Sequence, residues 1–254
     1  MFLSAYNFDI LIATGGFSMD QQFTIETFYE ELAKHQIVLS DTQKQQFLDY
    51  AKMLAEWNEK MNLTAITEIN EVYEKHFLDS LLPSFDVALT GTFCDVGAGA
   101  GFPSIPLKIV YPELKVTIVE TLGKRITFLK ELCHTLKLSD VTLVHERAEV
   151  YALTHRESFD VVSARAVANL RMLSELCIPL VKQGGIFLAM KGANAQSEYE
   201  EAKKALGTLG VKKEAEYEVH LSDQAKRINY VFRKVKATPK QYPRAFAKIK
   251  KNPL

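Results

Sequence analysis

The sequence predicts an α/β fold in which helices cover both faces of a mostly parallel sheet. Three observations support this fold class. Between residues 92 and 209, short β-branched segments alternate with amphipathic helical segments, which is the pattern of right-handed crossover units. A glycine-rich loop joins the first strand of this series to its first helix. The 254 residues, 47% hydrophobic and 24% charged, also suffice to bury a sizeable core.

The first 18 residues are expected to form an unstructured extension ahead of the helices. Their apolar stretch contains Asp9 and is too short to cross a bilayer, so no membrane association is predicted. No basic residue precedes Lys34, which argues against a signal peptide. The favoured interpretation is that residues 1–18 precede the true start at Met19, and the rival interpretation is a short docking segment.

Residues 19–85 are predicted to form an all-helical region. Phe23 and Phe28 are spaced for one face of a first helix. A capping box at residues 40–43 begins a second helix, and Pro83 ends a third. The three helices are expected at residues 20–35, from residue 40 through Trp57, and from Asn70 to Leu82.

Residues 86–236 carry the alternating part of the chain. Enrichment in β-branched and aromatic side chains predicts strands at residues 92–96, 115–120, 141–145, 159–163, 185–190, 214–221 and 228–235. Helical periodicity predicts helices at residues 103–111, 123–137, 169–181 and 194–209. The last two strands follow each other without a helix, so they are expected to form an antiparallel hairpin at the sheet edge.

The formal net charge is zero, but the basic residues are concentrated at the C-terminus. Residues 224–254 contain ten Lys and Arg and no acid, which leaves 21 basic and 31 acidic side chains in the rest of the chain. A cationic end on an anionic body favours a polyanionic partner such as nucleic acid. Residues 237–254 are therefore expected to be a basic tail in which Arg244 binds the substrate and Tyr242 and Phe246 stack on unpaired bases.

The cysteines and histidines predict neither a disulfide framework nor a metal site. Cys94, Cys133 and Cys177 lack the close spacing of such sites, and the six histidines show no metal-ligand spacing. Free thiols favour a reducing compartment, so a cytoplasmic location is expected.

The loop that begins at Asp95 reads Asp-Val-Gly-Ala-Gly-Ala-Gly-Phe-Pro. Gly97, Gly99 and Gly101 let the backbone turn tightly and approach a ligand at the carboxyl end of the strand. A dinucleotide fingerprint needs glycine where Phe102 stands, which disfavours a nicotinamide dehydrogenase. The acid-x-Gly-x-Gly-x-Gly pattern resembles motif I of the class I S-adenosylmethionine-dependent methyltransferases. The Asp95 carboxylate would repel a diphosphate but can help to hold the cationic ammonium and sulfonium groups of that cofactor.

Two further strand ends complete the expected cofactor site. Glu120 ends the second strand, where an acid can accept hydrogen bonds from both ribose hydroxyls. Ala148 and Glu149 follow the third strand, where a backbone amide or a carboxylate can bind the adenine edge.

Several longer motifs resemble a single family. The segments Trp57-Asn-Glu-Lys-Met-Asn-Leu-Thr64 and Lys75-His-Phe-Leu-Asp-Ser-Leu81 are similar to the ribosomal small-subunit RNA methyltransferase G family, also called glucose-inhibited division protein B. Further similar segments are Asp95–Pro106, Leu122–Leu129, Arg147–Glu149, Ser163–Ala166 and Ala189–Gly192. The resemblance covers residues 24–245.

This resemblance implies a Rossmann-like class I methyltransferase fold, with a mostly parallel seven-stranded sheet, an antiparallel edge and an N-terminal helical region. It implies transfer of a methyl group from S-adenosylmethionine to N7 of guanine-527 in 16S rRNA, either free or in the 30S subunit. By position, the family's cofactor contacts correspond to Gly97, Phe102, Ala148, Glu149 and Arg165. A monomer is expected, because nothing in the sequence demands a dimer.

The residues themselves are consistent with guanine N7 as the methyl acceptor. The chain lacks the Pro-Cys pair that activates pyrimidine C5 and the Pro-Pro pair found in loops that meet an adenine amine. Guanine N7 carries a lone pair and no proton. It therefore needs alignment and exclusion of water rather than a general base.

Cationic side chains at the strand ends and helix starts are the remaining candidates. Arg165 and Lys191 end the fourth and fifth strands and are expected to act catalytically by orienting substrate or cofactor. Lys124 and Arg125 begin a helix, where basic side chains oppose the helix dipole, so a substrate phosphate or a carboxylate is expected nearby. Three residues of the helical region are expected to line the target pocket, Asn62, His76 and Asp79.

Two other functions stay open at this point. A methyltransferase of the same fold acting on a small molecule or protein predicts turnover without RNA and no effect of deleting residues 238–254. A non-catalytic ribosome-assembly protein that keeps the cofactor pocket predicts binding of S-adenosylmethionine without methyl transfer.

Overall fold

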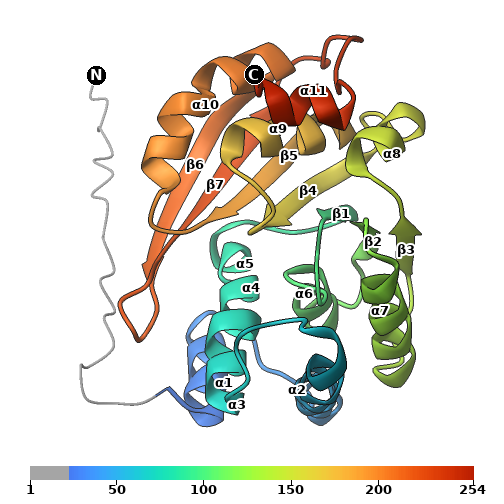
Figure 1. The fold of residues 1–254 in the computed structure, drawn as a ribbon. Helices are drawn as coiled ribbons and strands as arrows, with labels where there is room; N and C mark the ends of the chain where they lie inside the picture. The colour runs from blue at the N-terminus through green and yellow to red at the C-terminus, as the bar shows by residue number, and fades with distance from the viewer. Residues whose placement is uncertain (1–22) are drawn as a thin grey trace, which may run out of the picture.

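The computed structural model describes residues 23–254, in which one seven-stranded sheet has helices on both faces (Figure 1). The expectations for residues 1–18 fall outside the described residues. Within residues 23–254, no helix combines the length and apolar character that a membrane span requires. The same residues contain no cluster of three or more metal-ligating side chains.

The N-terminal region is helical, as the sequence predicts. Thr24 and Ser40 cap the first two helices with reciprocal capping boxes, which explains where each helix begins. The third predicted helix is present but contains a π-helical segment over Tyr73–Leu78, a wider turn that is common at functional sites. The bounds are α1 Ile25–Lys34, α2 Asp41–Met61, α3 Ile69–Val72, η1 Tyr73–Leu78, α4 Asp79–Leu81 and α5 Pro83–Asp86.

The second part of the chain contains all seven predicted strands. They are β1 Thr92–Val96, β2 Lys115–Glu120, β3 Val141–His145, β4 Phe159–Arg165, β5 Val181–Lys191, β6 Val211–His220 and β7 Lys226–Lys234. The helices are α6 Ser104–Val110, α7 Gly123–Thr135, α8 Ala148–Thr154, α9 Leu170–Cys177, the 3-10 turn η2 Ile178–Leu180, α10 Ala195–Leu209 and α11 Phe246–Lys251. The sequence prediction omits α5, α8 and α11.

The sheet order is β3-β2-β1-β4-β5-β7-β6. Strands β1 to β5 pair in parallel, and β7 runs antiparallel to both β5 and β6. This confirms the expected antiparallel hairpin at one edge. The carboxyl ends of the parallel strands meet at a single edge of the sheet, where open α/β sheets bind their ligands.

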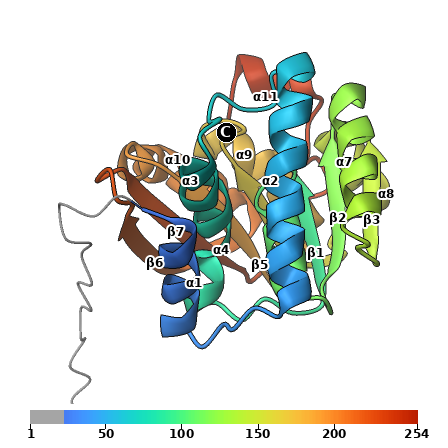
Figure 2. The same ribbon diagram turned by 90° about the horizontal axis from the view of Figure 1, so that it is seen from below.

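Alternation along the strands divides the buried side chains between two cores. Phe93 of β1 and Leu188 of β5 belong to the core beneath α1–α7, whereas their neighbours Cys94 and Phe187 belong to the core beneath α8–α11. Figure 2 shows the first of these layers, with α2 lying alongside α7. The helical region therefore shares its core with one face of the sheet.

The C-terminal segment is folded rather than a tail. Arg156 donates hydrogen bonds to the carbonyl oxygens of Thr238, Pro239 and Tyr242. After this segment, helix α11 packs against α9. Residues 237–254 therefore depart from the expected basic tail, because Arg156 and Arg171 of the body bind their backbone carbonyls.

Arg244 likewise departs from its expected role in substrate binding. Its guanidinium donates hydrogen bonds of 2.6 and 2.8 Å to the carboxylate of Glu175, whose side chain is fully buried. A buried carboxylate without a partner is strongly destabilising, so this ion pair is needed to fold the segment onto the body.

Candidate active site

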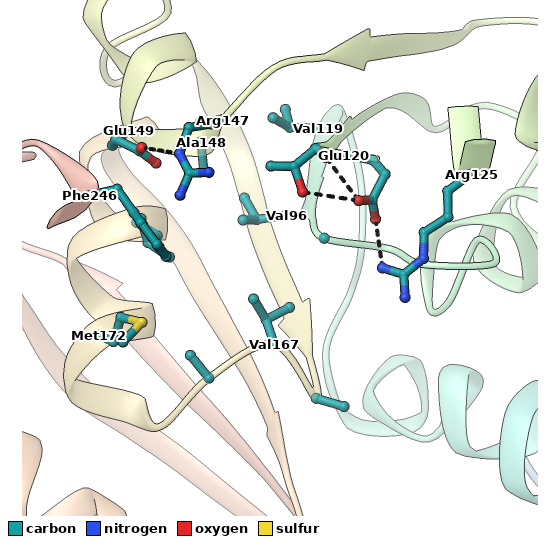
Figure 3. A pocket seen from close by; sticks show the side chains of 15 residues that line it. Val96, Val119, Glu120, Arg125, Arg147, Ala148, Glu149, Val167, Met172 and Phe246 are labelled. Atoms are coloured by element: carbon teal, nitrogen blue, oxygen red, sulfur yellow. Dashed lines mark hydrogen bonds and ion pairs between the residues drawn. The ribbon is translucent and has the colours of Figure 1, made fainter. Parts of the chain in front are cut away.

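A cavity of about 410 Å³ lies at the carboxyl ends of β1, β2 and β4. Figure 3 shows its lining, with Glu120 and Arg125 on one side and Met172 and Phe246 on the other. The lining residues are Val96, Gly97, Val119, Glu120, Thr121, Arg125, Arg147, Ala148, Glu149, Ala166, Val167, Ala168, Met172, Leu176 and Phe246. We call this space the first cavity.

Asp95 does not line the first cavity, contrary to the expectation that it holds cofactor cations. Its side chain is fully buried. It accepts hydrogen bonds from the backbone N–H of Ser104 at 3.1 Å and from the hydroxyl of Ser163 at 3.4 Å. Burial raises the pKa of Asp95 to about 7, although these hydrogen bonds oppose the rise. The structure therefore gives Asp95 the task of fixing the glycine loop between β1 and α6.

Two glycines of the loop have a positive φ and stand so close to neighbouring side chains that a Cβ would collide with them. Gly97 has φ 76°, and a Cβ there would lie 2.8 Å from a methyl group of Val167. Gly101 has φ 103°, and a Cβ there would lie 2.8 Å from the Tyr50 hydroxyl. That hydroxyl donates a hydrogen bond of 2.6 Å to the carbonyl of Ala100, so the helical region holds the loop from outside. Of the three expected loop glycines, only Gly97 lines the first cavity.

Glu120 is 2% exposed and presents a fixed carboxylate to the first cavity. One oxygen accepts hydrogen bonds from the backbone N–H groups of Thr121 and Leu122, at 2.8 and 3.0 Å. The other oxygen accepts from the N–H of Gly99 at 3.2 Å and from Arg125 at 3.3 Å. The loop and the end of β2 therefore converge on one acid, whose two oxygens suit a vicinal diol.

The opposite side of the first cavity is formed where α8 begins and by α9 and α11. Ala148 and Glu149 line it, as expected, and Glu149 pairs with Arg147 at 2.8 Å. Arg147 in turn stacks on the ring of Phe246, 3.9 Å from its centroid. This side of the cavity combines a flat cationic and aromatic contact with apolar neighbours.

A second cavity of about 440 Å³ shares Ala166 with the first. Its lining residues are Ile66, Lys75, His76, Asp79, Arg165, Ala166, Met190, Lys191, Gly192, Ala193, Asn194, Glu198, Arg227 and Asn229. They come from the helical region, from the ends of β4 and β5, and from β7. The second cavity is therefore built jointly by the two parts of the chain.

The carboxylates that line the second cavity are neutralised by neighbouring cations. Asp79 is bound by Arg165 at 2.7 Å and by Arg227 at 3.0 Å. Glu198 pairs with Lys191 at 2.6 Å. Both carboxylates are thus engaged in ion pairs with side chains of the protein.

His76 is held neutral between an aromatic ring and a cation. Its ring stacks on Phe102 at 4.4 Å, and its Nε2 lies 2.7 Å from the Thr64 hydroxyl. Arg165 lies over the same Phe102 ring, 5.0 Å from its centroid. Burial, together with the charge of Arg165, lowers the pKa of His76 to about 3. The buried Nδ1 has no hydrogen-bond partner.

The expected site residues are thus divided between the two cavities. Gly97, Glu120, Ala148, Glu149 and Arg125 line the first, whereas His76, Arg165 and Lys191 line the second. Seven expected residues line neither cavity, namely Asp95, Gly99, Gly101, Phe102, Asn62, Lys124 and Arg244. Asn62 ends α2 in a left-handed conformation, and Lys124 donates a hydrogen bond to the Met61 carbonyl.

Several lining residues escape the sequence analysis. Arg227 and Asn229 point to the same side of β7 because they are two residues apart, and that spacing is a signal available in the sequence. Met172 and Leu176 lie one helical turn apart on α9, which is equally typical of a core helix. Phe246 gives no periodic signal in a segment expected to be a tail.

The comparisons with known proteins agree on one family. Residues 43–228 match the family described as rRNA small subunit methyltransferase G. The chain is 53% identical over 234 residues to Ribosomal RNA small subunit methyltransferase G of Lysinibacillus sphaericus strain C3-41, covering 90% of this chain and 98% of that protein. It is 52% identical over 235 residues to the protein of the same name from Staphylococcus aureus strain Newman, covering 91% and 98%.

A solved structure supports the fold separately. Pyrococcus horikoshii TYW2 in complex with MeSAdo superposes with a TM-score of 0.51 at 17% identity, over 62% of each chain. At this identity the likeness extends to the fold alone. The family match and the two relatives span most of the chain and nearly all residues of both cavities, so the chain belongs to the rRNA small subunit methyltransferase G family.

Proposed function

We propose that this protein transfers a methyl group from S-adenosylmethionine to N7 of guanine-527 in 16S rRNA. The observation that carries the proposal is the junction of the two cavities at Ala166, at the carboxyl end of β4. A cofactor in one cavity and a base in the other would meet at this junction. Family membership supplies the RNA and the target position.

The residues of the first cavity fit S-adenosylmethionine. Glu120 offers two carboxylate oxygens to a ribose diol, and the apolar side near Met172 and Leu176 suits a purine ring. Gly97 allows the backbone to line the cavity without a side chain. When bound, the cofactor supplies a methyl group on a cationic sulfur.

The second cavity fits an acceptor that has no proton to lose. His76 is a poor base at neutral pH because its pKa is lowered to about 3, and Asp79 and Glu198 are both ion-paired. Guanine N7 needs none of these groups as a base. It needs to be desolvated and aligned, which a cavity lined by paired charges and a neutral ring can provide.

Arg165 and Lys191 contribute to this alignment in different ways. Arg165 lies over Phe102 and binds Asp79, so its position is fixed at the second cavity, where a guanidinium can bind guanine O6 or a phosphate. Lys191 donates a hydrogen bond of 2.9 Å to the carbonyl of Ala168 and pairs with Glu198. It positions the loop between the two cavities.

We propose that the protein acts as a monomer on free 16S rRNA or on the 30S subunit. Because the proposed substrate is ribosomal RNA, the proposed location is the cytoplasm. Binding through phosphate contacts should weaken steeply as salt is raised.

The test is methylation of 16S rRNA prepared from cells that lack this enzyme, offered naked and as 30S subunits. With labelled S-adenosylmethionine, we expect one methyl group per RNA, which mass mapping assigns to guanine-527. Incorporation at another nucleotide, or none into either substrate, would overturn the proposal.

A matched pair of variants on β7 ties the reaction to the second cavity. Arg227→Ala removes a cavity-lining arginine that binds Asp79, so methylation should fall. Arg233→Ala removes an arginine at the other end of the same strand, where it pairs with Glu214, and methylation should be retained. Equal activity of the two variants would contradict the assignment of this cavity to the RNA.

A further inference from the structure

The C-terminal helix α11 contributes one side chain to the first cavity. Phe246 is the first residue of α11, and in Figure 3 its ring points into the cavity from the side opposite Glu120. Its position falls outside residues 43–228, which carry the family match. From the sequence, this ring is expected to stack on RNA bases, but in the structure it points into the cavity.

The position of Phe246 is fixed by contacts on both sides of it in the chain. Two residues before it, Arg244 binds the buried carboxylate of Glu175. Three residues after it, Ile249 is fully buried in the core beneath α8–α11. Phe246 and Ile249 share one face of α11, because residues three apart on a helix are neighbours. The helix is therefore docked by its apolar face, and that docking places the ring.

The opposite face of α11 is polar. Lys248, Lys250 and Lys251 are exposed to solvent. Phe246 itself is only partly exposed and packs against the same core as Ile249. The helix thus directs its basic side chains outward and its one aromatic side chain toward the cavity.

The two sides of the first cavity match the two parts of an adenosine. Glu120 and Arg125 make one side polar, whereas Met172, Leu176 and Phe246 give the other side an apolar surface beside the Arg147–Glu149 ion pair. A ribose diol bound at Glu120 directs the attached flat base toward the apolar side. Arg147 stacks on the Phe246 ring at 3.9 Å, so an adenine must use the other face of the ring or displace the guanidinium.

We propose that Phe246 packs against the adenine of S-adenosylmethionine, so that the C-terminal helix is part of the cofactor site. This inference rests on the proposed function in taking that molecule as the cofactor. It makes Phe246 a cofactor-binding residue for this reaction. The docking of residues 237–254 on the body then completes the cofactor site.

The first test is calorimetric titration of the full-length protein with S-adenosylhomocysteine. An aromatic ring stacked on a base contributes enough that Phe246→Ala should weaken binding roughly tenfold or more. Phe246→Tyr keeps the ring and should bind within a fewfold of the wild type. Lys250→Ala, on the exposed face of the same helix, serves as the matched control and should leave the affinity unchanged. Unchanged affinity of Phe246→Ala would overturn the inference.

A second variant tests the contact between residue 246 and the cofactor by tryptophan fluorescence. The chain has a single tryptophan, Trp57, which packs against Phe128 in the helical region. Phe246→Trp adds an indole at the cavity, and its emission should change when S-adenosylhomocysteine is added, over the background of the wild type. Calorimetric binding by this variant without any emission change beyond that background would overturn the inference.

The outcomes separate this inference from the proposed function. If the wild type itself fails to bind S-adenosylhomocysteine, the proposed cofactor is wrong, and the inference falls with it. If the wild type binds and Phe246→Ala binds equally well, the proposed function stands and only the role of Phe246 is refuted. Thermal unfolding of each variant, followed by circular dichroism, checks that α11 stays docked.

Discussion

His76 is expected to make the folded state lose stability as the pH falls. Its pKa is lowered from 6.5 to about 3 by burial and by the neighbouring charge of Arg165. The folded state therefore binds fewer protons than the unfolded state between these two values. The stability present above pH 6.5 is lost as the pH falls toward 3.

The size of this loss follows from the two pKa values. One pKa unit corresponds to about 1.4 kcal/mol, so the difference between 6.5 and about 3 amounts to about 5 kcal/mol when the pH is below both values. At pH 5 the loss is smaller, about 2 kcal/mol, because only the unfolded state is then protonated to a large extent.

The assay is urea unfolding of the wild type and of His76→Gln at pH 7.5 and pH 5. Glutamine does not titrate, and its amide can still bond to the Thr64 hydroxyl that His76 contacts. The free energy of unfolding should fall by about 2 kcal/mol more in the wild type than in the variant. An equal fall in both proteins would refute the reasoning, because it would mean that His76 titrates normally in the folded state.

The other predictions concern the loop and the arginine at the second cavity. Asp95 should affect stability in the opposite sense to His76, because its pKa is raised to about 7 in the folded state, so the folded state loses stability as the pH rises. The wild type should lose about 3 kcal/mol of unfolding free energy between pH 5 and pH 8 through this group. Urea unfolding of Asp95→Asn should show that this loss is absent. Gly97→Ala should cost roughly 1–2 kcal/mol for its positive φ. Contact with Val167 should add to that cost, and calorimetry should show weaker binding of S-adenosylhomocysteine. Arg165→Lys keeps the charge but loses the planar contact on Phe102 and the geometry at Asp79, so kcat should fall while the Kd for the cofactor stays within a fewfold; an unchanged kcat would contradict the proposed role.

Most of the strands could be predicted because they contain a short run of apolar and β-branched residues, whereas β6 alternates charged and apolar side chains. Elements that lack either pattern were missed. Helix α8 has seven residues and no proline in its first turn, whereas α6, of the same length, follows Pro103. The π-helical segment at Tyr73–Leu78 has the same apolar spacing as an α-helix to within one residue, so only the structure reveals it. Helix α11 is short and basic, and its docking depends on distant partners such as Glu175.

A site residue could be predicted where an acid stands at the end of a predicted strand, as Glu120 does. It could not be predicted where burial decides the role. Asp95 and Glu120 are both acids at strand ends, but Asp95 is surrounded by Ser104 and Ser163, whereas Glu120 lines a cavity. Nothing local in the sequence distinguishes these environments. The same holds for Arg244, whose carboxylate partner lies far away in the chain.

The backbone that follows β4 forms the junction of the two cavities and is held in place by ion pairs and hydrogen bonds. Ala166 lines both cavities and has φ 55°, a left-handed conformation that costs free energy in any residue with a Cβ. Residues held in such conformations persist only when their surroundings fix them. Arg165, immediately before it, is fixed by Asp79, and Lys191 binds the carbonyl of Ala168 just after it. The ion pairs of the second cavity therefore also fix the stretch of backbone that forms the wall between the two cavities.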